Sequence, residues 1–215
     1  MRTLRGLRPT GRISGELAML LRALTLGLIT LSAASAQALD MSAADIVASR
    51  CGVCHGTNGQ ATAPIYPSLA GQNAQYITKQ LTDFVAGRRV NETMSPQAQD
   101  LSPQNIAELA AFFSAKPPRV GRAANAESVA LGKFLYTQGN ASANMPACAS
   151  CHGDSAHGTA LLPRLAGQNA RYLTGQLQDF TLRQRTNDNA VMHDIAAKLT
   201  PADIKAVTDY LTQLP

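Results

Sequence analysis

The chain lacks tryptophan altogether, and no segment of it alternates convincingly between apolar and polar residues as a β-strand does. It also lacks an uninterrupted apolar run of the ~20 residues that a membrane-spanning helix needs. The missing strand alternation argues against a β-sheet fold, and the missing apolar run argues against a membrane-spanning helix. The periodic patterns that are present are helical, and we predict an all-α fold.

The first 36 residues have the order of a cleaved secretory signal. Five arginines precede the short apolar run Ala23–Leu31, and the small residues Ala33–Ala36 follow it. We expect cleavage after Ala36 or Ala38. The alternative is an uncleaved membrane anchor, which the short apolar run disfavours. A cleaved leader predicts export to the periplasm.

A strong net charge is missing once this leader is set aside. The whole chain carries 19 basic and 14 acidic residues, a net charge of +5. The leader holds five of the arginines and one glutamate, so residues 37–215 carry 14 basic and 13 acidic residues, or +1. This balance gives no support for nucleic-acid binding.

Cysteine is scarce, and all four residues lie in two pentapeptides, Cys51-Gly52-Val53-Cys54-His55 and Cys148-Ala149-Ser150-Cys151-His152. C-x-x-C-H is the attachment sequence for c-type haem. Its two thiols form thioethers with the haem vinyl groups, and its histidine can take an axial position on the iron. Two such runs, with no cysteine left over, predict two covalently bound haem c groups.

Three alternative interpretations of these cysteines are a zinc site, a thioredoxin-like redox pair and ordinary disulfides. Structural zinc usually takes its ligands from closer segments, whereas the two C-x-x-C units start 97 residues apart. A thioredoxin-like pair needs a βαβ setting, which this sequence does not have. Disulfides remain open for an exported protein with an even number of cysteines.

The region after the leader is an internal duplication. Leu69–Ala74 recurs as Leu165–Ala170 at an offset of 96 residues. At the same offset, the first-copy residues Tyr76, Gln80, Leu81, Asp83 and Phe84 match Tyr172, Gln176, Leu177, Asp179 and Phe180. Leu101–Pro103 matches Leu199–Pro201 at an offset of 98, so two residues are inserted between positions 187 and 199.

The duplication predicts two domains, at residues 37–116 and 124–215. Residues 117–123 form the predicted linker, because the two prolines at its start block helix continuation and its glycine relaxes the chain. Each copy is short and has no tryptophan, and domains this small often need a metal or another staple. A covalently held porphyrin would supply the missing apolar centre.

Helix signals recur in both copies. Ser42 with Asp45, Ser102 with Pro103, and Thr200 with Pro201 are typical of helix N-termini. Apolar residues at helical spacing mark the faces that we expect to be buried. These are Ile77, Leu81, Phe84 and Val85; Ile106, Leu109, Ala110 and Phe113; and Ile204, Val207 and Leu211.

The second axial ligands follow from the repeat. His55 is the only histidine of the first copy, whose methionines are Met41 and Met94. Of these, only Met94 has a counterpart in the second copy, Met192. Thioether is a soft ligand suited to low-spin haem iron, and His/Met ligation raises the reduction potential. We therefore predict that His55 and Met94 bind one iron, and that His152 and Met192 bind the other.

Three further second-copy residues compete for the ligand position. Met145 lies three residues before Cys148, too close to reach the opposite haem face. His157 is expected in an exposed loop. His193 adjoins Met192, but the first copy has Ser95 at the matching place. We expect structural or incidental roles for all three.

With both C-x-x-C-H-G runs, both Pro-x-Leu-Ala-Gly-Gln segments and the matching methionines, residues 40–215 resemble the cytochrome c4 family, dihaem proteins made of two class I cytochrome c domains. The resemblance implies that the carbonyls of Pro67 and Pro163 accept a hydrogen bond from Nδ1 of the haem histidines. It also implies that the haem edges meet near the domain interface and exchange electrons quickly.

We expect an electron carrier and not an enzyme, because two filled axial positions leave no open site for peroxide or oxygen chemistry. By resemblance, the redox partners are a quinol-oxidising complex and a terminal oxidase of the respiratory chain. The alternative is the dihaem subunit of a larger oxidoreductase, such as a flavocytochrome sulfide dehydrogenase. Because residues 88–93 differ from 184–191, we also expect two unequal potentials.

Overall fold

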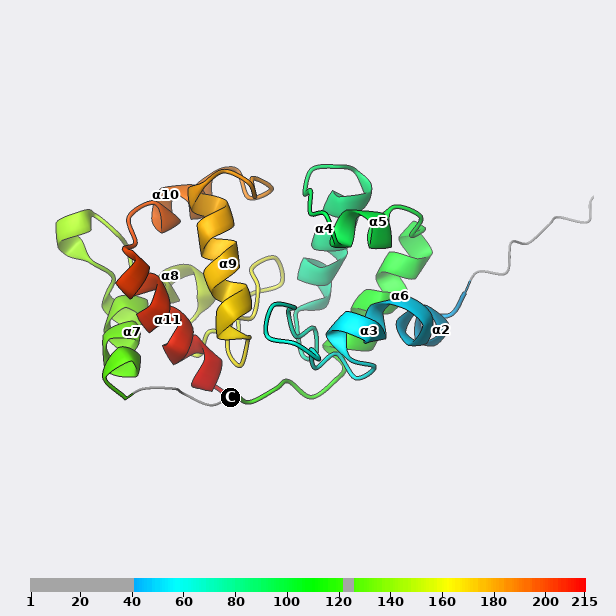
Figure 1. The fold of residues 1–215 in the computed structure, drawn as a ribbon, viewed down its shortest axis with the longest axis horizontal. Coiled ribbons are helices and arrows are strands. Elements are labelled where there is room, and N and C mark those ends of the chain that lie inside the picture. The colour runs from blue at the N-terminus through cyan, green and yellow to red at the C-terminus, as the bar shows by residue number, and fades with distance from the viewer. Residues whose placement is uncertain (1–40, 122–125) are drawn as a thin grey trace, which may run out of the picture. The chain divides into compact units, whose positions relative to one another are not determined.

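The computed structural model describes residues 41–121 and 126–215, and the first copy is built of helices and short helical turns, two of which contain the first C-x-x-C-H run. In chain order they are α2 (Ala43–Ile46), the π-helical turn η1 (Val47–Cys51), α3 (Gly52–His55), α4 (Ala74–Val85), α5 (Met94–Ala98) and α6 (Pro103–Ser114). α4 packs against α6 and α5, and α2 also contacts α6 (Figure 1).

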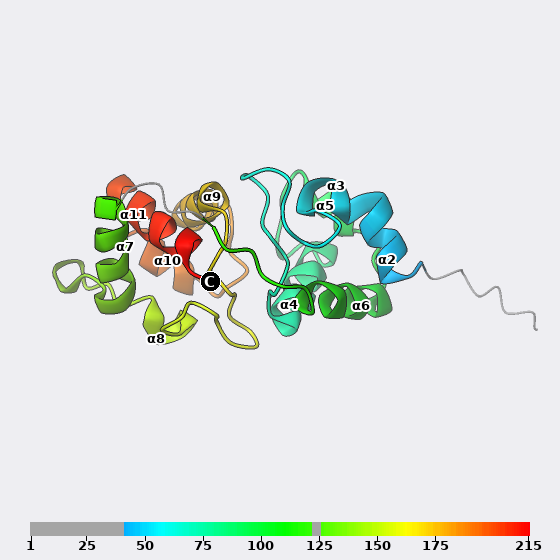
Figure 2. The ribbon, with the colours of Figure 1, turned by 90° about the horizontal axis from the view of Figure 1, so that it is seen from below.

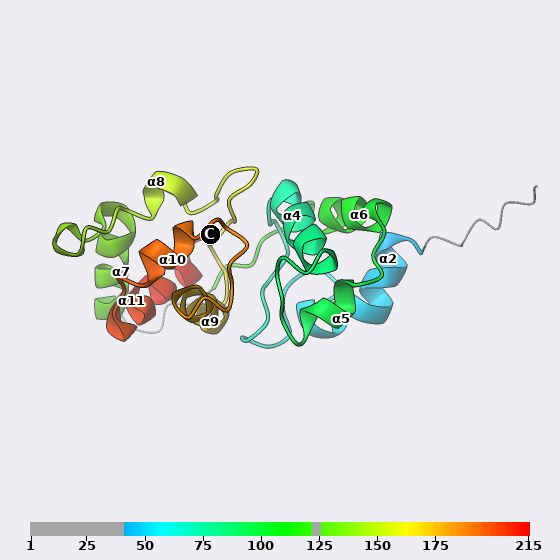
Figure 3. The ribbon, with the colours of Figure 1, turned by 90° about the horizontal axis from the view of Figure 1, so that it is seen from above.

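The second copy repeats this plan. Its elements are α7 (Ala126–Gln138), the 3-10 turn η2 (Ala141–Ala143), α8 (Ala149–His152), α9 (Ala170–Thr181), α10 (Val191–Ala196) and α11 (Pro201–Gln213). α7 and α11 lie side by side (Figure 2), and α9 contacts both α11 and α10 (Figure 3). Within the described residues the only β-type pairing is an isolated bridge between Asn140 and Met145. The predicted all-α fold is confirmed.

The helix starts fall where the capping signals placed them. Ser42 accepts a hydrogen bond from the Asp45 amide at the start of α2. α6 and α11 each begin with proline after a capping box, Ser102 with Asn105 and Thr200 with Asp203. Reciprocal caps of this kind satisfy amides that the first helical turn leaves without partners.

The expected apolar faces are buried, apart from Leu81, which is partly buried, and Val85, which is exposed. Ile77, Phe84 and the α6 residues Ile106, Leu109, Ala110 and Phe113 form the first core, and Val207 and Leu211 belong to the second. Val85 was expected on the buried face of α4, but it is 42% exposed. Eight residues along a helix rotate a side chain about 80° beyond whole turns, so Val85 turns away from the stripe that Ile77 begins.

Residues 117–121, the described part of the predicted linker, have no regular secondary structure. Gly121 nevertheless packs tightly, because a Cβ there would lie 2.1 Å from the carbonyl oxygen of Thr212. This glycine is therefore needed for close approach to α11, rather than to relax the chain. Met41–Pro215 form one compact unit, and the exact domain boundaries stay a prediction.

The predicted leader and its cleavage site lie outside the described residues. In the part of the chain that the structure does describe, no helix has the length and apolar character needed to cross a membrane.

Candidate haem sites

The two C-x-x-C-H runs fold alike, each ending in a four-residue helix, α3 or α8, with the histidine as its last residue. The glycine that follows each histidine has positive φ, +74° at Gly56 and +78° at Gly153. A Cβ at Gly56 would also lie 2.2 Å from the Gln60 carbonyl oxygen, so glycine is required there. The shared turn directs the chain toward the proline segment that contacts the histidine.

His55 is 5% exposed, and its Nδ1 lies 2.8 Å from the carbonyl oxygen of Pro67. A carbonyl only accepts, so Nδ1 carries the proton and Nε2 keeps a free lone pair. Burial lowers the pKa of His55, and the Pro67 hydrogen bond opposes this only in part. The result is a neutral imidazole with one nitrogen ready to bind a metal.

His152 repeats the arrangement with a looser contact. It is 7% exposed, and its Nδ1 lies 3.4 Å from the carbonyl oxygen of Pro163. Burial again lowers the histidine pKa against the opposing effect of the proline carbonyl. Both hydrogen bonds implied by the family resemblance are therefore present, the second one longer and weaker.

None of the four cysteines forms a disulfide in the described part of the chain. Burial raises the pKa of Cys51, and it raises the pKa of Cys148 to about 11. A reactive redox pair needs a lowered thiol pKa, so these environments argue against the thioredoxin-like alternative. Among the described residues no three His, Cys, Asp or Glu side chains are placed to hold a metal ion together.

Met94 and Met192 occupy matching places at the start of short helices. Met94 is the first residue of α5, and its amide donates to Oδ1 of Asn91 at 2.9 Å. Met192 is the second residue of α10, and its amide donates to Oδ2 of Asp188 at 2.6 Å. Both side chains are half-buried. Each copy thus offers one methionine with a fixed backbone.

The competing residues have other surroundings. Met41 is 46% exposed ahead of α2, whereas Met145 is 4% exposed. His157 lies in an exposed loop, as expected, with Nε2 3.2 Å from the Pro215 carbonyl oxygen. Nδ1 of His193 lies 3.0 Å from the carbonyl oxygen of Phe180, at the end of α9. The axial ligand assignment itself stays a prediction.

Two thiols, a neutral imidazole and a thioether in each copy are the donor set that a c-type haem with His/Met ligation requires. The residues present therefore fit the group that the attachment sequence implies. Cys51, Cys54, Cys148 and Cys151 would hold it covalently, and the histidines and methionines would bind the iron.

Reciprocal glutamines join the two copies, and the sequence interpretation missed them. Gln72 bonds to the Arg164 backbone, donating to its carbonyl at 3.0 Å and accepting from its amide at 2.7 Å. Gln168 bonds to the Ser68 backbone in the same way, at 2.9 and 2.8 Å. The repeated Leu-Ala-Gly-Gln segment was the available signal. Each glutamine thus closes a two-bond pair with the opposite copy.

Two arginines form a second symmetric contact. Arg89 donates to Gln80 and Gln176, both at 2.7 Å. Arg185, its counterpart at an offset of 96, donates to the same two glutamines at 3.1 and 2.7 Å. Each guanidinium also stacks on a phenylalanine of its own copy, with distances of 4.7 and 4.6 Å to the ring centroid. The repeat symmetry of the sequence is thus also present at the contact between the copies.

Both copies match models of cytochrome c families. Residues 38–113 match the family described as cytochrome C oxidase, cbb3-type, subunit III, and residues 129–215 match the family described as cytochrome c. Each match contains one C-x-x-C-H run. The chain is therefore a c-type cytochrome with two such domains and two covalently bound haem c groups.

The chain is 41% identical to cytochrome c4 of Azotobacter vinelandii, over 89% of this chain and 95% of that protein. It is 37% identical to a thiosulfate dehydrogenase electron acceptor of Stutzerimonas stutzeri, over 80% and 82%. The crystal structure of reduced recombinant cytochrome c4 from Pseudomonas stutzeri matches with a TM-score of 0.73 at 38% identity, over 77% of this chain and 93% of that one. The chain belongs to the cytochrome c4 family, as the sequence motifs predicted, and its general role is electron transfer.

Proposed function

We propose that the protein is an exported electron carrier between respiratory redox partners, and that it turns over no substrate of its own. The observation that carries this proposal is the matching donor set of the copies: a buried neutral imidazole held by a proline carbonyl, with a methionine at the same repeat position. His55 with Met94, and His152 with Met192, would bind the two irons and would leave neither with an open position. Bound haem c supplies reversible one-electron chemistry at iron.

The chain's own groups hold these donors in place. The proline carbonyls fix the tautomer and the ring orientation of the two histidines. Asn91 and Asp188 fix the backbone at the two methionines. Burial of both imidazoles keeps water away from them. Because the donors are held in this way, little of the protein must move when the charge at either site changes.

The proposed partners are a quinol-oxidising complex as donor and a terminal oxidase as acceptor, in the periplasm. The leader-like residues 1–36 support export, after which the protein is soluble or loosely membrane-associated. The net charge of +1 on residues 37–215 predicts only a moderate effect of salt on the electron-transfer rate. Stopped-flow oxidation by a purified terminal oxidase at several ionic strengths tests this, and a steep salt dependence would contradict it.

A second candidate is the electron-accepting partner or subunit of a sulfur-compound dehydrogenase. The name of the Stutzerimonas stutzeri relative, thiosulfate dehydrogenase electron acceptor, favours this candidate. Native purification separates the two. A free carrier elutes alone, whereas a subunit elutes with a second protein whose substrate reduces the haems.

A further inference from the structure

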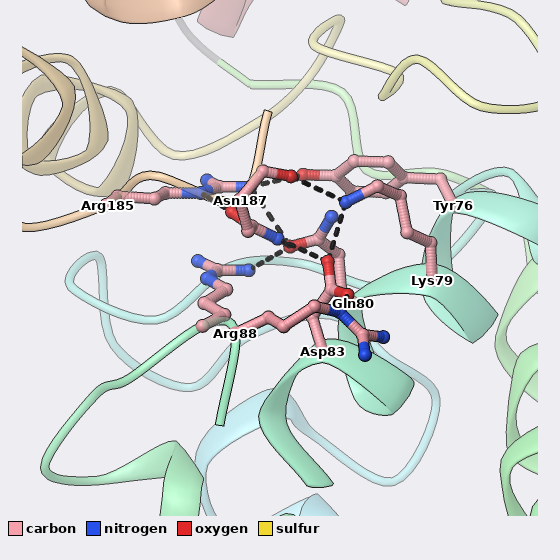
Figure 4. A network of polar contacts seen from close by, with 8 residues as sticks. Tyr76, Lys79, Gln80, Asp83, Arg88, Arg185 and Asn187 are labelled. Carbon is pink, nitrogen blue, oxygen red and sulfur yellow. Dashed lines mark hydrogen bonds and ion pairs between the residues drawn. The ribbon is translucent and has the colours of Figure 1, made fainter. Parts of the chain in front are cut away.

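The segment that leads into Met192 contacts the first copy through Asn187. The Asn187 carbonyl accepts a hydrogen bond from Nζ of Lys79 at 2.7 Å. Its side-chain amide donates to Oδ2 of Asp83 at 2.6 Å and to Oε1 of Gln80 at 3.1 Å. All three partners lie on α4 of the first copy, and their side chains converge on Asn187 (Figure 4).

Asp83 is the centre of this contact. Its side chain is only 5% exposed and pairs with Lys79 at 2.6 Å and with Arg88 at 2.7 Å. Burial raises the pKa of Asp83, but the hydrogen bonds from Lys79, Asn187 and Arg88 outweigh burial and lower it overall. Asp83 is therefore an ionised acceptor at neutral pH. Lys79 and Arg88 balance its negative charge and hold the carboxylate in one orientation.

The contact has no mirror image in the repeat. The counterparts of Lys79 and Arg88 are Gly175 and Gln184. Asp179, the counterpart of Asp83, accepts from Gln176 of its own copy at 2.9 Å. Asn91, the counterpart of Asn187, is exposed and accepts hydrogen bonds from the amides of Thr93 and Met94. The Asn91 side chain thus bonds within its own loop, whereas the Asn187 side chain also bonds to the opposite copy.

The second loop also carries backbone strain. Asn189 and Ala190, in the region of the two-residue insertion, have φ of +57° and +65°. A left-handed conformation is sterically unfavourable for alanine, because its Cβ comes too close to the following carbonyl oxygen. Such strain persists only where neighbouring contacts hold the chain in place. The contacts of Asn187 lie just before this strained turn, and the hydrogen bond from the Met192 amide to Asp188 spans it.

We propose that Asp83, a residue of the first copy, is a positioning residue for Met192 in the second. Asp83 fixes Asn187, and Asn187 fixes the adjacent Asp188, which holds the Met192 amide. The second thioether therefore depends on how firmly the first copy holds Asn187, which Arg185 of its own copy also contacts at 3.2 Å. The side-chain contacts of Asn91, by contrast, lie within its own loop. The inference rests on the proposed function, in which Met192 binds iron.

Imidazole displacement of the axial thioether in the ferric holoprotein tests this. The far-red sulfur-to-iron band reports each bound methionine, and its loss against imidazole concentration measures how firmly each is held. Loss of a hydrogen bond to a charged group is expected to loosen Met192 by about tenfold. Asp83→Ala and Asn187→Ala should each shift half of the band to lower imidazole concentration. The shifted half must vanish when Met192→Ala is added.

Matched variants separate positioning from general loosening. Asp83→Asn keeps an acceptor for Asn187 and should restore most of the original affinity, although it removes both ion pairs. Asp179→Ala, at the repeat counterpart, should leave both halves of the band unchanged. Asn187 is half-buried in a loop, so its variant remains informative if Asp83→Ala fails to fold.

The outcomes distinguish this inference from the function on which it rests. The inference alone is overturned if the unmutated protein shows the far-red band of both haems, but Asp83→Ala and Asn187→Ala leave the imidazole displacement of both methionines unchanged. Equal loosening of both sites, or the same effect from Asp179→Ala, also overturns it. An unmutated protein that lacks the Met192 contribution overturns the proposed ligand set and the inference together.

Discussion

Asn91 and Asp188 do the same task in the two copies with different charge. Each accepts a hydrogen bond from the amide of a predicted axial methionine, Asn91 from Met94 and Asp188 from Met192. Among the described residues the second carboxylate oxygen of Asp188, Oδ1, is buried without a hydrogen-bond partner. The Met94 amide is therefore bonded to a neutral side-chain amide, whereas the Met192 amide is bonded to a carboxylate with only one hydrogen-bonded oxygen.

This difference predicts opposite effects of reciprocal substitutions on the reduction potentials. A carboxylate favours the ferric state, so Asp188→Asn should raise the potential of the second haem by tens of millivolts, roughly the effect of one charge at an effective dielectric of about 20. Asn91→Asp should lower that of the first haem. Spectroscopic redox titration of the two variants measures both. A shift of the same sign in both variants would contradict the electrostatic explanation.

The reciprocal glutamines predict a second effect. Gln168→Ala removes both hydrogen bonds to Ser68, a buried residue, and leaves its amide and carbonyl without these partners. Such a loss typically costs about 1–3 kcal/mol. The free energy of unfolding in urea should fall by this amount, whereas Gln104→Ala on the exposed face of α6 should change it little. Equal free energies of unfolding for the two variants would show that the hydrogen bonds between Gln168 and Ser68 contribute nothing to stability.

Much of this structure was predictable from local patterns. The capping residues Ser102 and Thr200 gave the starts of α6 and α11, and the repeat singled out Met94 and Met192. Contacts between the copies were not predictable, because a residue that is identical in both repeats does not reveal which residue of the other copy it contacts. Gln168 was therefore identified only as a family residue, and the close approach of Gly121 to α11 was interpreted as flexibility.

Asp83 predicts a dependence of stability on acid. Its pKa is lowered in the folded state, because the hydrogen bonds from Lys79, Asn187 and Arg88 outweigh burial. Its contribution is therefore full above the ordinary aspartate pKa of ~3.9 and is lost as the pH falls below that value. Urea unfolding should show a stability gap between the unmutated protein and Asp83→Asn near neutral pH. The gap should narrow near pH ~3, and a gap that is constant with pH would exclude Asp83 as the cause.

The central claim is that His55 with Met94, and His152 with Met192, leave no vacancy on either iron. Carbon monoxide binding to the reduced holoprotein tests this most directly. The unmutated protein should bind it poorly at both haems, and so should Met41→Ala. Met94→Ala and Met192→Ala should each open one haem, although His193 beside Met192 can fill the second vacancy. Stoichiometric carbon monoxide binding at one haem of the unmutated protein would contradict the carrier function and favour a catalytic one.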